Sequence, residues 1–81
     1  MAFTILVKNE GATATYTVEQ QINPAERLVI FNDILSLGDE RELQAYTTED
    51  DGDSGGIFLW SRPGSSIYSK DVSAGGTLYV E

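Results

Sequence analysis

The chain has 81 residues, with 13 acidic and five basic side chains and a formal net charge of −8 at pH 7. This length holds one core, so residues 1–81 are expected to form a single small domain. The sequence contains neither histidine nor cysteine, which excludes histidine-assisted nucleophiles, the usual zinc sites and disulfide bonds.

The first 20 residues predict two strands. Residues 3–9 form an apolar, β-branched run, and residues 13–20 alternate between apolar and polar side chains, with Gly11 between the two runs. In the second run Tyr16 and Val18 share one face, and the threonines share the other. A period of two on both sides of a glycine predicts a β-hairpin.

The segment 24–37 permits two interpretations. Asn23 and Pro24 suit the start of a helix, and Gly38 suits its end. The apolar run 27–31 suits a buried strand, for which Asn23 and Pro24 would supply the preceding turn. The β-branched and aromatic residues favour the strand, and a helix over residues 24–37 packed on one sheet is the alternative.

Beyond residue 38 the pattern indicates short strands separated by turns. Strands are expected over residues 41–48, 57–61, 66–70 and 77–80. Short strands with a turn about every ten residues are typical of a β-sandwich. We therefore expect an all-β, compact antiparallel sandwich of about six or seven strands.

Alternation along these strands assigns one set of side chains to the core. If Ile57 and Leu59 face inward, Phe58 and Trp60 point to the opposite face. The expected core is Phe3, Ile5, Val7, Ala14, Tyr16, Val18, Leu28, Ile30, Leu43, Ala45, Ile57, Leu59, Leu78 and Val80.

The segment Gly52-Asp53-Ser54-Gly55-Gly56 resembles the sequence around the nucleophilic serine of chymotrypsin-like proteases. Their chemistry needs a general base, normally histidine, and this chain has none. Ile57 also stands where that family has a proline, and the chain is too short for the double barrel that presents such a serine. No other catalytic set is visible, so we expect a protein that is not an enzyme.

Most of the negative charge lies in residues 39–53, where seven acidic residues stand against one arginine. Glu49, Asp50, Asp51 and Asp53 are hard oxygen ligands in a glycine-rich loop, as Ca²⁺ requires, but they do not follow the spacing of an EF-hand. They form a candidate weak Ca²⁺ site, and a solvated loop tip is the alternative. No other cofactor is expected.

Trp60, Arg62 and Tyr68 are the candidate interaction residues, because they flank the turn at residues 62–65. Exposed aromatic rings beside a turn can anchor a protein interface or stack on a sugar ring. Core or partial-core packing of the aromatic rings on the strand before this turn is the favoured interpretation, and a binding platform is the alternative.

These features favour a non-enzymatic, small acidic protein-interaction module, with self-association included among its partners. The alternative is a Ca²⁺-assisted carbohydrate-binding module that uses the acidic loop and Trp60. No nucleic-acid partner is expected, because five scattered basic residues cannot neutralise many phosphates. No membrane insertion is expected, because no apolar run approaches the roughly 20 residues of a spanning helix. Without a visible leader, the chain is expected to be cytoplasmic, or a mature exported chain whose leader is absent.

Overall fold

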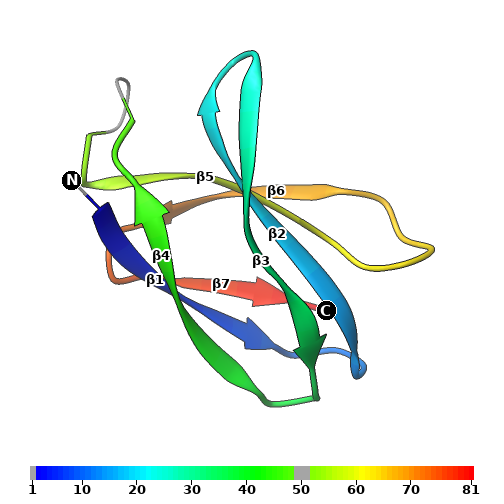
Figure 1. The fold of residues 1–81 in the computed structure, drawn as a ribbon. Coiled ribbons are helices and arrows are strands. Elements are labelled where there is room, and N and C mark those ends of the chain that lie inside the picture. Colours follow the sequence, from blue (N-terminus) through cyan, green and yellow to red (C-terminus); the bar gives the residue numbers. More distant parts are fainter. Residues whose placement is uncertain (1, 49–51) are drawn as a thin grey trace.

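The structure is a computed structural model that describes residues 2–48 and 52–81. Its strands form two packed sheets, one with the order β4-β1-β7 and one with the order β3-β2-β5-β6 (Figure 1). This confirms the all-β, sandwich-like fold expected from the sequence. The strands are β1 (Ala2–Asn9), β2 (Ala14–Asn23), β3 (Glu26–Leu35), β4 (Glu40–Tyr46), β5 (Gly55–Ser61), β6 (Tyr68–Ser73) and β7 (Thr77–Val80).

The two sheets differ in their pairing. In the smaller sheet β1 is the central strand. It pairs antiparallel with β4 and parallel with β7. In the larger sheet β2 pairs with β3 and β5, and β5 pairs with β6, all antiparallel. The parallel pair arises because the chain crosses from the larger sheet to the smaller one between β6 and β7. Each sheet therefore has two outer strands, β4 and β7 in one and β3 and β6 in the other.

The segment 24–37 contains strand β3, so the alternative of a helix over residues 24–37 is wrong. The side-chain oxygen of Asn23, which could have capped a helix, accepts the backbone N–H of Ala25 at 2.9 Å and closes the turn between β2 and β3. Ile30 is an extra residue in the pairing with β2, and it produces a β-bulge in β3.

The hairpin predicted over residues 3–20 is wrong, because β1 and β2 belong to different sheets. The link between them crosses the sandwich instead of folding back within one sheet. Both arrangements need two apolar runs and a short turn, so the local pattern does not separate them. Gly11 fits the crossing because the chain passes close to Glu81, whose backbone carbon would lie 2.5 Å from a Cβ at position 11.

The amide of Asn9 holds this crossing together. Its side chain is fully buried, with 0% exposed, and its Nδ2 donates to the carbonyls of Ala12 at 3.0 Å and Leu35 at 2.9 Å. Its Oδ1 accepts the N–H of Gly11 at 2.9 Å and the hydroxyl of Tyr16 at 3.1 Å. The two donors and the two acceptor sites of one amide are thereby satisfied, and they join the end of β1 to β2 and to the end of β3.

A second buried amide joins the sheets near their other end. Gln20 of β2 is 0% exposed, and its Nε2 donates to the carbonyl of Tyr46 at 2.7 Å. The backbone N–H of Tyr46 donates to Oε1 of Gln20, also at 2.7 Å. The side chain of Gln20 therefore pairs with the outer edge of β4 as a neighbouring strand would.

The core between the sheets differs from the prediction mainly on β5. Leu28 is 38% exposed on the outer strand β3, and Ile57 and Leu59 lie half-buried on the outer face. Phe58 and Trp60 are buried instead, because they stand opposite inward-facing residues of β2 and offer more apolar area. The buried apolar residues are Phe3, Ile5, Val7, Tyr16, Val18, Leu35, Leu43, Ala45, Phe58, Trp60, Val72, Leu78 and Val80, with Ala14, Ile30 and Phe31 partly buried against them.

Replacing Asn9 tests the role of its amide. The substitution Asn9→Ala leaves the buried carbonyl of Leu35 and the N–H of Gly11 without their side-chain partner, and it should lower the free energy of unfolding by about 2–4 kcal/mol. Tyr16→Phe is the matched control, because Asn9 and Ala12 keep their mutual bond, and it should cost about 1 kcal/mol. Urea denaturation followed by Trp60 fluorescence measures both values, and equal losses would contradict this role of Asn9.

Candidate functional site

Trp60 is a core residue, which confirms the interpretation that its ring packs against the core, and the interpretation as an exposed surface aromatic is wrong for this residue. It lies near the end of β5 and is only 7% exposed. Its ring centroid lies 6.1 Å from that of Tyr16 in β2 and 4.7 Å from that of Tyr68. The indole is therefore held between a buried ring and a ring at the surface.

Tyr68 is the aromatic side chain that reaches solvent. As the first residue of β6 it stands opposite Trp60 in the sheet, and its ring stacks on the indole with an interplanar angle of 25°. The residue is nevertheless 50% exposed. One face of the tyrosine ring is thus fixed against the core, and the rest of the side chain is open to a partner.

Arg62 is positioned beside these rings by the turn that follows β5. Gly64 takes a φ of +79°, a conformation that favours glycine, and the N–H of Ser65 donates to the carbonyl of Arg62 at 3.1 Å. The guanidinium Nε donates to the carbonyl oxygen of Glu81 at 2.9 Å. This bond ties the turn to the residue that follows β7.

The four residues Trp60, Arg62, Tyr68 and Glu81 line a shallow surface depression of about 330 Å³, which we call the aromatic patch. The structure thus brings together the three interaction residues predicted from the sequence. Glu81 was not identified from the sequence, because the packing of β7 beside β6 places it there and that contact has no local sequence pattern.

The predicted Ca²⁺ site falls largely outside the described residues, since Glu49, Asp50 and Asp51 are not among them. Asp53 is described and is exposed in the turn before β5. Next to it, Gly52 donates its N–H to the carbonyl of Thr48 at 2.8 Å. Within residues 2–48 and 52–81, no three acidic side chains gather in a way that could hold a metal ion.

Asp53 and the aromatic patch lie at opposite ends of β5. From Gly55 to Trp60 an extended strand covers about 17 Å, because each residue adds roughly 3.4 Å. In Figure 1, β5 begins at the left beside the N-terminus, and the loop that follows it lies at the far right. Asp53 and Trp60 are therefore not brought together, and they do not form one carbohydrate site.

The glycines of the protease-like segment have a packing role. A Cβ at Gly55 would lie 2.6 Å from the carbonyl oxygen of Val72 in β6. A Cβ at Gly56 would lie 3.1 Å from Nε2 of the buried Gln20. The close approach of β6 and of the buried amide explains why two glycines follow Ser54, without reference to catalysis.

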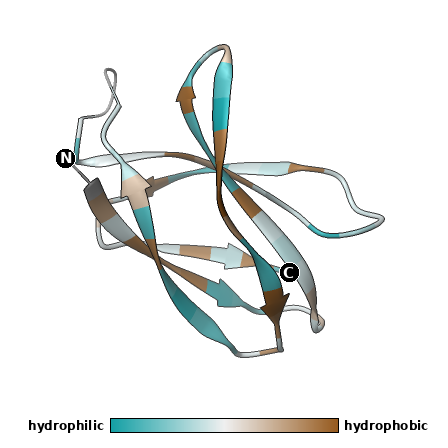
Figure 2. Ribbon diagram, viewed as in Figure 1, coloured by the Kyte–Doolittle hydropathy of each residue, from teal (hydrophilic) through white to brown (hydrophobic). Residues whose placement is uncertain are grey.

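The large exposed apolar side chains of the described residues lie mostly in two places. Ile67 and Tyr68 lie at the start of β6, beside the aromatic patch, and Tyr79 lies apart from them on β7. Figure 2 shows apolar stretches alternating with hydrophilic ones along β3. The remaining exposed residues, in β3, the turn after it and β4, are Leu28, Val29, Ile34, Leu37 and Tyr46.

No helix long and apolar enough to cross a membrane occurs in the part of the chain that the structure describes. We also compared the chain with models of known protein families, with curated proteins and with solved structures, and none of them matched.

Proposed function

We propose that this chain is a non-enzymatic, acidic protein-interaction module that binds through the aromatic patch. The observation that carries the proposal is the stacking of the half-exposed Tyr68 on the buried Trp60, beside the guanidinium of Arg62. Tryptophan, tyrosine and arginine are the residues most enriched among those that dominate protein-binding energies.

Preorganisation supports this use of the patch. A flexible side chain loses rotamer freedom when it binds, and that loss weakens the complex. Here the stack on Trp60 restricts the ring of Tyr68 before any partner arrives, and the bond to Glu81 restricts Arg62. That bond engages Nε of Arg62, so the terminal nitrogens can donate to a carboxylate or a carbonyl of the partner.

The net charge of −8 adds long-range selectivity. A strongly acidic protein attracts positively charged surfaces and repels acidic ones, which raises the rate of encounter with basic partners. Self-association through the patch would work against this charge. A second copy of the chain is nevertheless included in the proposal as a partner, and sedimentation equilibrium would detect the resulting oligomer.

The substitution Tyr68→Ala tests the proposal. It removes the exposed ring, and it should weaken partner binding by about 1–2 kcal/mol, equivalent to about 5–30-fold. The measurement is capture of partners from cell extract by the immobilised chain, followed by titration of the captured proteins.

Tyr79→Ala is the matched control, because Tyr79 is a comparably exposed tyrosine, at 55%, that does not line the depression. Thermal unfolding of both variants checks that the sandwich is intact. Capture of the same proteins with unchanged affinity by Tyr68→Ala would refute the patch as the binding surface.

A carbohydrate-binding module is the second candidate, because the open face of Tyr68 could also stack on a sugar ring. The separation of Asp53 from the patch along β5 argues against a Ca²⁺-assisted version. If the protein-interaction proposal holds, a glycan array should give no signal with or without Ca²⁺. A selective signal that Tyr68→Ala abolishes would favour the carbohydrate module instead.

A Ca²⁺ titration followed by ¹⁵N–¹H NMR, with Mg²⁺ as control at about 0.15 M salt, tests the acidic loop separately. Adjacent carboxylates that only attract counterions should give small, unsaturating shifts that are the same for both ions. Saturable shifts confined to residues 49–56 and selective for Ca²⁺ would instead establish a metal site there.

A further inference from the structure

We infer that residues 27–31 of β3 form a second docking site, at which an extended basic segment of another protein adds as a strand to the larger sheet. This site lies on the opposite outer strand from the aromatic patch, and it stands whether or not that patch binds a partner.

The outer edge of β3 is closed near its end. Oδ1 of Asp33 accepts the backbone N–H of Ile34 at 2.7 Å. A strand edge whose N–H groups are already bonded is a poor template for another chain. Among the hydrogen bonds of the described residues, none from a side chain closes the edge over residues 27–31 in this way.

The pairing with β2 indicates which backbone groups face outward. Ile34 donates to a side chain of its own strand, so its pair with Thr15 is one in which the backbone groups point away from β2. Such pairs alternate along an antiparallel ladder. Counted across the bulge at Ile30, the alternation assigns Val29 and Arg27 to the outward-facing set.

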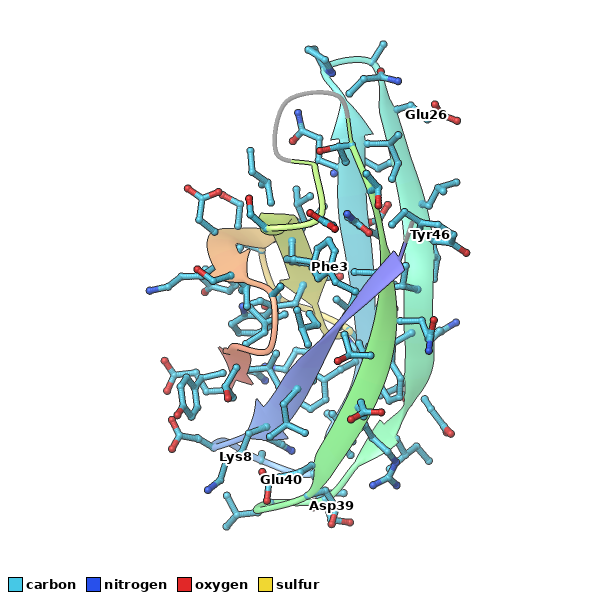
Figure 3. The ribbon with its side chains drawn as sticks, turned by 90° about the vertical axis from the view of Figure 1, so that its left-hand side faces the viewer. Phe3, Lys8, Glu26, Asp39, Glu40 and Tyr46 are labelled. Carbon is cyan, nitrogen blue, oxygen red and sulfur yellow. The ribbon has the colours of Figure 1, made fainter. Side chains whose placement is uncertain are left out.

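The hairpin of β2 and β3 gives a partner room to approach. Its tip rises clear of the other strands in Figure 1, and in Figure 3 β3 runs along the right-hand margin of the molecule with Glu26 near that tip. The other long outer strand, β4, is less accessible, since Gln20 bonds both backbone groups of Tyr46 and Arg41 donates to the carbonyl of Glu40.

Apolar side chains flank the open edge on both faces of the sheet. Val29 points to the outer face and is 59% exposed, whereas Leu28 points to the inner face and is 38% exposed. An added strand would cover both, with alternate side chains packing on either face. Backbone pairing would supply affinity, and these apolar contacts would fix the register.

The charge beside the edge indicates a basic occupant. Glu26 precedes residues 27–31 and Asp33 follows them, and among the described residues neither carboxylate forms an ion pair. The charge of Arg27 is offset by Glu19, whose carboxylate oxygen lies 3.9 Å from its Nε. Lysine or arginine side chains on the added strand would therefore find acidic partners at both ends of the site.

A second copy of this chain is a less favourable occupant, because it carries the same net charge of −8. Two strongly acidic chains repel each other, so a basic segment from a different protein is the better occupant.

The probe that tests this inference is a capped nonapeptide of alternating lysine and valine, titrated at about 0.15 M salt and followed by ¹⁵N–¹H NMR and amide hydrogen exchange. Saturable shifts should centre on residues 27–31. The amide of Val29 should exchange about tenfold more slowly in the complex, because it becomes paired.

Two matched substitutions locate the site. Val29→Lys should weaken peptide binding by about tenfold, because it places a like charge in the open edge. Ile34→Lys adds the same charge on the same face of β3, at a residue of similar exposure, 57% against 59%, whose N–H is already bonded. It should change the affinity by less than about twofold, and equal weakening by both would overturn the inference.

A peptide N-methylated at alternate residues separates strand addition from simple charge attraction, since it keeps the charge and cannot pair along that edge. It should not bind, and binding with unchanged affinity would overturn the inference. Shifts centred on Arg62 and Tyr68 would place the peptide in the aromatic patch and would also overturn it. Protection of Val29 that grows with protein concentration in the absence of peptide would identify a second copy as the occupant instead.

Discussion

The sandwich depends on two buried amide side chains that join its sheets. Asn9 and Gln20 are both fully buried, and each binds backbone groups of segments outside its own strand. A chain of 81 residues without cysteine or histidine has no disulfide or zinc site to hold two small sheets in register. The amides do this work because each supplies donors and acceptors in one planar group, and both are satisfied without a charge in the core.

Side chains also hydrogen-bond to backbone groups at the edges of the sheets. Asp33 closes part of β3, and Gln20 and Arg41 close backbone groups of β4. Each closure lowers the tendency of an acidic, highly β-structured chain to pair with its own copies. A strand edge that no side chain closes, and that lies next to exposed apolar residues, differs from these closed positions. Residues 27–31 meet that description, which is why they carry the inference of a docking site.

The strand content could be predicted from the sequence, whereas the partners of each strand could not. Alternation placed Tyr16 and Val18 correctly in the core, because the period of two is a local property. The same local signals made the segment from β1 to β2 resemble a hairpin, although Asn9 directs the chain into the other sheet. On β5 the prediction placed Leu59 in the core, whereas the structure buries the next residue, Trp60. Residues 57–60 are all apolar, so they show no alternation that indicates which face is buried.

The topology also determines how the two proposed surfaces relate. Tyr68 begins β6 and Val29 lies in β3, so the surfaces occupy opposite outer strands of one four-stranded sheet. Three spacings of about 4.8 Å separate those strands, which is roughly 14 Å of backbone. An added strand on β3 would extend the sheet away from β6 and would leave the ring of Tyr68 uncovered. Occupation of one surface therefore does not sterically exclude the other, and the sandwich can act as a rigid spacer between two partners.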